Sequence, residues 1–295
     1  MRPSGRKSIL LFVFKNSQGR TYNEDEKGNE QDNILLGDCT AKADTPWLYP
    51  ESTAGRAQGF LRQRLRLCDF HIHLRGGMTV VKALARERAS GIASAFIANH
   101  GRGWEIDTNE KLNAFINAAR ATGLADGRLI RVGAQVNDRD WFRQIDAATR
   151  NRLDFILADA LIMDGQKLWE DFPIPDPEAW MERYFAHNMQ ILDEPITILA
   201  NPTYLPKPLE SQWDKLWTDA RLKALFAKAK EKGIAMEVQA ESPFQQHSRY
   251  LKFARESGCL ISLGTNNFDD HALRLDTWFS ALDALALPPS RLLAF

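Results

Sequence analysis

Short apolar runs rich in β-branched and aromatic residues recur along the chain from residue 65 onward, and such runs are typical of buried strands. They cover residues 65–73, 93–100, 130–137, 154–163, 196–202, 235–241 and 260–267. Helical spacing of apolar residues fills four of the intervals between them. Each of these four predicted helices stops at a glycine, the residue that most often follows a last helical turn: Gly91, Gly123, Gly233 and Gly258.

Seven strands joined by helical crossovers predict an α/β fold with a parallel sheet. We expect a seven-stranded, distorted TIM-like parallel β/α barrel over residues 65–295, with an open doubly wound sheet as the alternative. No GxGxxG follows the first run, so the sequence gives no support for a dinucleotide-binding fold. The final residues, RLLAF (291–295), are a candidate eighth short strand. Residues 1–60 lack periodicity and are rich in polar residues and turn formers, which predicts a poorly ordered N-terminal leader.

Composition excludes several classes of protein. The chain has 295 residues, 44% of them hydrophobic, and 38 basic residues balance 38 acidic ones. A sizeable core is therefore expected, and neither nucleic acid nor a membrane surface is predicted as a partner. Three widely spaced cysteines form no disulfide framework and indicate a cytoplasmic protein. The short run SILLFVF (8–14) behind basic residues leaves secretion as the weaker alternative.

Polar residues gather where the predicted strands end, although buried parallel strands are usually apolar throughout. The carboxyl ends of barrel strands form the active-site face, so we expect these side chains to converge there. They are His71, His73, His100, Gln135, Asn137, Asp159, Asn201, Glu237, Gln239, Glu241, Asn266 and Asn267.

The sharpest motif is His-x-His in the sequence DFHIHLRGG. Residues i and i+2 of a strand share a face, so His71 and His73 are expected to direct both imidazoles into one cavity. Two neutral imidazoles suit zinc, manganese, iron or nickel. Glu237 and Asp159 would each be costly to bury without a partner, which is either a metal or an arginine.

Two arginines are candidate clamps for an anionic group. Arg75 precedes two glycines, and Arg102 lies between Gly101 and Gly103 in the sequence NHGRG. A guanidinium binds a carboxylate or phosphate through two parallel hydrogen bonds. The alternative for both residues is a solvated loop charge.

The sequences DFHIHLRGG and NHG resemble the polymerase and histidinol phosphatase (PHP) family of metal-dependent phosphoesterases. Further motifs, GAQVNDRDW, FILADAL, ILANPTYLP and GTNN, are similar to a branch of PHP-like, TIM-barrel metal-dependent hydrolases. The resemblance covers about residues 67–290 and implies a distorted seven-stranded α/β barrel.

The chain matches the family pattern at His71, His73 and His100 and departs from it at three ligand positions. Asn201 stands where the family has histidine, Asn266 where it has aspartate, and Gln135 and Asn137 lie where a glutamate usually ends the third strand. The resemblance therefore implies one or two divalent ions, zinc, manganese or iron, rather than a three-metal cluster. It places His71 and His73 as metal ligands together with Glu237 or Asp159.

We expect a hydrolase that acts on a small anionic substrate through metal-activated water. His100 or Asp159 would transfer the proton, and Arg75 or Arg102 would hold the anion. Gln135, Asn201 and Asn266 would donate hydrogen bonds to the substrate. The alternatives are a metal-poor barrel that only binds a ligand, and an amidohydrolase-type enzyme that cleaves C–N or ester bonds. The sequence makes no prediction of an oligomeric state.

Overall fold

Seven parallel strands close into a barrel in the order β1-β2-β3-β4-β7-β8-β9, with β9 paired back to β1. The computed structural model describes residues 47–240, 242–245, 247–272 and 275–294. The strands are β1 (Cys68–His73), β2 (Ala93–His100), β3 (Arg131–Val136), β4 (Phe155–Asp159), β7 (Ile198–Ala200), β8 (Ala235–Gln239) and β9 (Ile261–Gly264). This arrangement confirms the predicted seven-stranded parallel β/α barrel.

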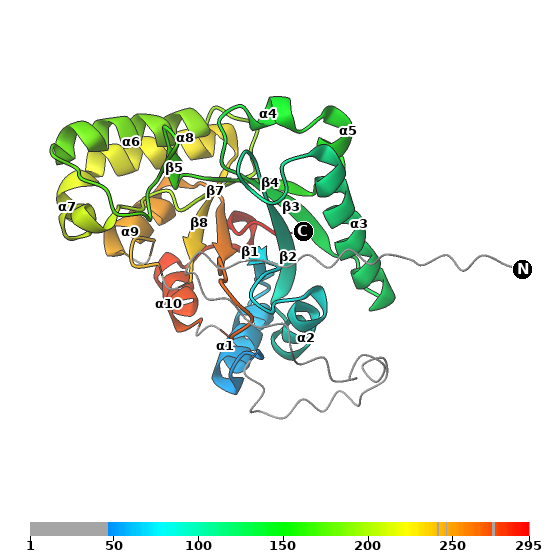
Figure 1. Cartoon of the computed structure of the whole chain (residues 1–295). Coiled ribbons are helices and arrows are strands. Elements are labelled where there is room, and N and C mark those ends of the chain that lie inside the picture. The colour runs from blue at the N-terminus through cyan, green and yellow to red at the C-terminus, as the bar shows by residue number, and fades with distance from the viewer. Residues whose placement is uncertain (1–46, 241, 246, 273–274, 295) are drawn as a thin grey trace, which may run out of the picture.

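Helices surround the barrel (Figure 1). The longer ones are α1 (Glu51–Arg62), α2 (Val80–Ser90), α3 (Asn109–Ala125), α6 (Pro177–Ile191), α8 (Asp219–Lys232), α9 (Ser248–Ser257) and α10 (Asp276–Leu285). Shorter elements occupy the loops: α4 (Trp141–Gln144), α5 (Ala147–Arg150), β5 (Ile162–Met163), β6 (Gln166–Lys167), η1 (Lys207–Gln212), α7 (Trp213–Leu216) and η2 (Pro289–Arg291). None of the helices in the described ranges combines the length and the apolar composition of a membrane span.

Three of the four predicted helix ends are confirmed, since Gly91, Gly233 and Gly258 follow α2, α8 and α9 in the left-handed conformation. The prediction for Gly123 is wrong, because α3 continues to Ala125. A Cβ at Gly123 would lie 2.7 Å from Cγ2 of Ile130. This glycine therefore allows close packing inside the helix, a role that sequence spacing does not reveal.

The predicted leader contains a packed helix. Its first 46 residues lie outside the described part of the chain, but α1 occupies Glu51–Arg62. Thr53, Ala57 and Phe60 share its buried face, and Phe60 stacks on Phe279 of α10 with ring centroids 5.5 Å apart. The prediction of disorder up to residue 60 is therefore wrong for this helix. Its apolar stripe is short and is hard to recognise in the sequence, because the helix also contains two glycines and a polar face.

The predicted eighth strand at the C-terminus is not formed over residues 291–294. One isolated parallel bridge joins Ile261 to Leu292, and the backbone N of Leu293 donates to the carbonyl of Ile261 at 2.7 Å. These contacts lie beside the start of β9, at the amino-terminal end of the strands, and they form no strand.

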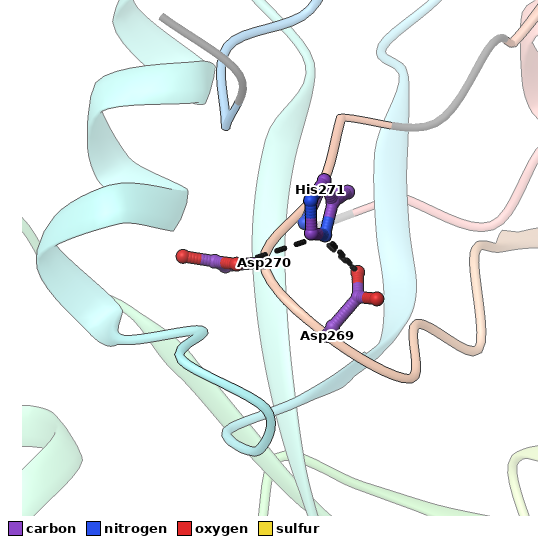
Figure 2. A group of neighbouring side chains, drawn as sticks. All are labelled: Asp269, Asp270 and His271. Carbon is purple, nitrogen blue, oxygen red and sulfur yellow. Dashed lines mark hydrogen bonds and ion pairs between the residues drawn. The ribbon is translucent and has the colours of Figure 1, made fainter.

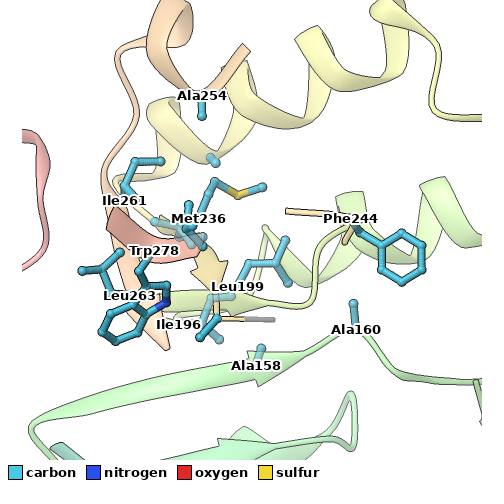
Figure 3. Close-up of a cluster of buried hydrophobic side chains, with 14 of the residues drawn as sticks. Ala158, Ala160, Ile196, Leu199, Met236, Phe244, Ala254, Ile261, Leu263 and Trp278 are labelled. Carbon is cyan, nitrogen blue, oxygen red and sulfur yellow. The ribbon is translucent and has the colours of Figure 1, made fainter. Parts of the chain in front are cut away.

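Two apolar layers build the core. The inner layer fills the barrel with Cys68, Phe70, Ala95, Ile97, Phe155, Leu157, Ile198, Ala200 and Ala235. The outer layer packs the sheet against the helices, and Figure 3 shows part of it, including Leu199, Met236, Leu263 and Trp278. The inner apolar layer is built from β1, β2, β4, β7 and β8, and buried polar side chains lie toward the carboxyl ends of the strands.

Candidate active site

A bulge in β1 decides which way the histidines of the His-x-His motif point. Asp69 pairs with Ser94 and Ile72 with Phe96, so β1 uses three residue steps where β2 uses two. A bulge of one residue exchanges the two faces of a strand beyond it. Phe70 accordingly belongs to the inner layer, whereas Ile72, two residues on, belongs to the outer layer. His71 and His73 therefore point into the barrel.

The Asp69 carboxylate holds this bulge. Oδ1 accepts hydrogen bonds from the backbone N of His71 at 3.1 Å and of Thr265 at 3.0 Å. Oδ2 accepts from Oγ1 of Thr265 at 2.6 Å. Burial raises the pKa of Asp69 even though these bonds stabilise its charged form. Asp69 thus fixes the direction of the first histidine without facing the cavity.

Five buried polar residues from five strand ends close a ring of hydrogen bonds, which we call the mouth ring: His71, Gln135, Asp159, Asn201 and Glu237. His71 Nδ1 lies 2.6 Å from Glu237 Oε1, and His71 Nε2 lies 3.2 Å from Gln135 Oε1. Gln135 Nε2 donates to Asp159 Oδ2 at 2.8 Å, and Asn201 Nδ2 donates to Asp159 Oδ1 at 3.3 Å. The backbone N of Asn201 closes the ring on Glu237 Oε2 at 3.1 Å.

Two local features make room for the mouth ring. Asn201 follows β7 with a φ of 51°, a left-handed turn that Asn tolerates better than most residues. Gly264 ends β9, where a Cβ would lie 2.1 Å from Glu237 Oε1 and 2.7 Å from His71 Cβ. The absence of a side chain at Gly264 therefore allows the His71–Glu237 pair to form.

The hydrogen-bond chemistry of the mouth ring requires a positive charge at His71. Glu237 Oε1 and Gln135 Oε1 are both acceptors, and the amide of Gln135 is oriented by its donation to Asp159. Each ring nitrogen must therefore donate a proton or face a cation. Burial lowers the pKa of His71, but the carboxylates of Glu237, Asp159 and Asp69 outweigh it, so the pKa is raised. Burial raises the pKa of Asp159 to about 6.

His73 lies beside the mouth ring, with its ring centroid 5.1 Å from that of His71. Its Nε2 faces Asn266 Oδ1 at 3.1 Å. Burial and the positive charges of Arg75 and His71 hold the pKa of His73 well below its ordinary value, so this imidazole is neutral.

Asn267 positions His73, a role that the sequence argument missed. Asn267 Oδ1 accepts from the backbone N of His73 at 2.7 Å, and Asn267 Nδ2 donates to the carbonyl of His73 at 2.9 Å. The amide thus continues the pairing of β1 with β9 beyond the last ladder residues. The sequence signal was its place in GTNN, among the polar residues that follow the last strand.

The two candidate anion clamps differ. Arg75 is partly buried beside His73, where its Nε donates to the carbonyl of Asn267 at 3.0 Å and its guanidinium lies 4.9 Å from the ring centroid of Phe268. Burial lowers the pKa of Arg75 to about 10. The Arg102 side chain is 66% exposed and forms an ion pair with Asp140. Arg75 therefore lies at the site, and Arg102 is a surface residue whose charge is already paired.

His100 ends β2 at the same end of the barrel but faces away from the mouth ring. Alternation along β2 places it with Phe96 and Ala98, which belong to the outer layer. Its side chain is fully buried, and neither ring nitrogen has a hydrogen-bond partner in the described part of the chain. Burial lowers the pKa of His100 against the opposing charges of Asp138 and Asp107.

The mouth ring fits one divalent ion in place of the His71 Nε2 proton. Two ligands about 2.1 Å from a tetrahedral zinc ion are about 3.4 Å apart, close to the separation of His71 Nε2 and Gln135 Oε1. Glu237 matches the carboxylate that commonly holds the second nitrogen of a metal-binding histidine. Each Glu237 oxygen accepts one hydrogen bond in the mouth ring, so Glu237 orients His71, and its role as a metal ligand stays a prediction.

Among the described residues, Asp269, Asp270 and His271 form a separate group whose three possible ligand atoms lie within 4.8 Å of one another. These residues lie on the loop after β9 (Figure 2), and the His271 side chain is 72% exposed. Asp270 is already paired with Lys82. Nothing beyond acidic clustering marks this loop as a metal site.

A surface cavity of about 340 Å³ lies at the opposite end of the barrel. Its lining includes Cys68, Ala93 and Arg131, which begin β1, β2 and β3. Because barrel active sites are built at the carboxyl ends of the strands, this cavity lies apart from the mouth ring.

Neither a protein-family model nor a curated protein matches the sequence. Among solved structures, the chain is similar to the crystal structure of histidinol phosphate phosphatase (HISK) from Lactococcus lactis subsp. lactis Il1403, complexed with zinc, L-histidinol and phosphate. The match has a TM-score of 0.59 and 15% identity, and it covers 76% of this chain and 95% of that one. The chain has the fold of a histidinol phosphate phosphatase. The resemblance to the PHP barrel is thereby confirmed at the level of fold.

Proposed function

We propose that this protein is a metal-dependent, phosphoesterase-like hydrolase that acts on a small anionic substrate. The observation that carries the proposal is the placement of His71, whose Nδ1 is held by Glu237 while its Nε2 faces a second acceptor, Gln135 Oε1. That arrangement suits a metal-binding imidazole. The fold supports the proposal, because the similar phosphatase was crystallised with zinc, L-histidinol and phosphate.

His71 and His73 would hold one ion, zinc, manganese or iron, and Gln135 Oε1 would complete that side of the site. A bound divalent ion lowers the pKa of a coordinated water toward neutrality and polarises the bond to be cleaved. Glu237 would keep the Nδ1 proton on His71, so that the Nε2 lone pair faces the cavity.

Asp159 is the better placed of the two residues predicted to transfer a proton. It lies within the mouth ring, and its pKa of about 6 suits a group that exchanges protons near neutral pH. Asp159 Oδ2, which Gln135 Nε2 contacts, is the atom that would hold the proton. His100 would have to turn from the outer layer toward the cavity to take this role.

Substrate binding is assigned to Arg75, because Arg102 is exposed and paired with Asp140. Among the amides, Asn266 lies beside His73, and its amide nitrogen is left to donate to a substrate. Gln135 and Asn201 donate to Asp159 within the mouth ring, so they would reach a substrate only by exchanging these bonds.

A ligand-binding protein without catalysis is the second candidate, and one observation favours it. With His71 protonated, every hydrogen bond of the mouth ring has one donor and one acceptor, and no ion is needed. The ring of hydrogen bonds can close without an ion because the neutral amides of Gln135 and Asn201 donate to Asp159. An amidohydrolase-type reaction has less support, since residues 261–267 contain no aspartate.

Metal content separates the two candidates. Wild type, the double variant His71→Ala/His73→Ala and the control His271→Ala would be purified side by side without chelator, and metal per chain measured. We expect about one ion in wild type and in the control, and none in the double variant, with unchanged far-UV circular dichroism. Equal content in wild type and the double variant, or none in either, leaves the binding protein as the function. Loss in His271→Ala alone would place the ion on the loop after β9.

A further inference from the structure

Arg75 and Arg139 are both partly buried arginines near the strand ends, and of these two only Arg139 has a carboxylate partner among the described residues. Arg139 is also shielded from solvent, but Glu194 pairs with it at 3.1 Å. Arg75 donates its Nε to a neutral carbonyl and forms an ion pair with no described carboxylate. A partly buried charge without a carboxylate partner has lost some of its solvation, so a ligand that supplies the negative charge would stabilise it.

Phe268 lies against that guanidinium and is itself exposed. The Arg75 guanidinium lies over the Phe268 ring at 4.9 Å, and 76% of Phe268 is accessible to solvent. Asn267 links the pair to the metal-binding strand, because its carbonyl accepts from Arg75 Nε while its side chain brackets the backbone of His73. The Nε bond and the stacking leave the two Nη groups of Arg75 to bind an anion.

The loops that carry Arg75 and Phe268 pack too tightly to separate easily. A Cβ at Gly76, whose φ is 57°, would lie 2.5 Å from the carbonyl oxygen of Phe268. The backbone N of Asp270 donates to the carbonyl of Gly76 at 3.0 Å. The arginine and the aromatic ring are therefore held together before any ligand binds.

We propose that Arg75 and Phe268 form a subsite that selects an anionic group attached to a planar aromatic body. Arg75 binds the anion through its Nη groups, and the attached ring packs against the exposed surface of Phe268. The inference deepens the proposed function by naming the substrate class, and it rests on the mouth ring being the reactive site.

The test uses phenylphosphonate and methylphosphonate, which share an anionic head and contain a P–C bond that a phosphoesterase does not hydrolyse. Binding to the full chain would be measured by calorimetry. Because contacts between aromatic rings stabilise by about 3- to 10-fold in affinity, wild type should prefer phenylphosphonate by about that factor. Phe268→Ala should lose the preference, Phe268→Trp should keep it, and Arg75→Met should bind neither compound measurably.

Phe142→Ala is the matched control, because Phe142 is also exposed and also lies under an arginine, Arg143, at 5.7 Å. This variant should keep the preference for phenylphosphonate. The subsite is overturned if wild type binds both compounds equally or binds neither, if Phe268→Ala retains the preference, or if Phe142→Ala loses it as well.

The binding test and the metal test fail independently. A protein that holds metal but shows no preference for the aromatic phosphonate would keep the hydrolase proposal and lose the subsite. A protein with the preference but without metal would keep the subsite and lose the hydrolase.

Discussion

Glu237 Oε1 lies 2.6 Å from His71 Nδ1, and the two side chains, 166 positions apart in the chain, are 1% and 0% exposed. β1 and β8 are not neighbours in the sheet, since β9 lies between them. The pair therefore spans the inside of the barrel across Gly264. Its burial makes the two groups mutually dependent, because each would be costly to keep charged without the other.

Removing the Glu237 side chain should destabilise the fold. We expect Glu237→Ala to lower the free energy of unfolding by about 3–5 kcal/mol, because it leaves the charge on His71 buried and unpaired. Urea denaturation measures the change. As the control, Glu182→Ala removes the carboxylate that pairs with Arg221 at the surface and should change the free energy by less than about 1 kcal/mol. Equal effects of the two substitutions would contradict a special role for the buried pair.

A methyl group at residue 264 should disrupt the site. Gly264→Ala would place Cβ 2.1 Å from Glu237 Oε1, so the His71–Glu237 bond must break or the strands must shift. We expect a loss of about 1–3 kcal/mol in the free energy of unfolding together with loss of bound metal. Gly59→Ala is the control, since a Cβ there meets nothing within 4 Å and should stabilise α1 by about 0.5–1 kcal/mol. Unchanged metal content in Gly264→Ala would show that the pair is not needed for binding.

Asp159 should make stability fall as pH rises from about 4 to 6. Its pKa is raised from 3.8 to about 6, so in this window the folded protein keeps a proton that the unfolded chain releases. The stability that this proton contributes is present below pH 4 and lost above pH 6, a change of about 3 kcal/mol. The difference in unfolding free energy between wild type and Asp159→Asn should fall by that amount across the window. A difference independent of pH would place the pKa of Asp159 near its ordinary value.

Helix α1 should be an integral part of the fold. Phe60→Ala removes a buried ring that stacks on Phe279, and we expect it to lower the free energy of unfolding by about 3 kcal/mol. Gln63→Ala, at an exposed position just after the helix, should change it by less than about 0.5 kcal/mol. Thermal or urea unfolding of the full chain provides the comparison. If Phe60→Ala is as stable as wild type, α1 is only loosely attached.

The sequence by itself determined the class of fold and the end of the barrel that carries the polar residues. Seven apolar runs separated by helical segments specify parallel strands, and polar residues at each run's end must meet because parallel strands end on one face. Gln135, Asp159, Asn201 and Glu237 were found by that argument, and the structure joins them to His71 in one ring. The alternation rule correctly placed His71 and His73 on one face.

The tertiary structure alone decided which way each polar side chain faces and what it contacts. The bulge that turns His71 inward depends on the hydrogen bonds between Asp69 and Thr265, which is 196 positions away. The periodicity of a strand cannot predict such a long-range contact. The same limit explains why His100 was expected at the site although it faces the helices. The same limit applies to Glu237, which was predicted as a metal ligand and whose two oxygens are bonded in the structure to His71 and Asn201. Periodicity is a local property of the chain, whereas direction and partnership are set by contacts between distant segments.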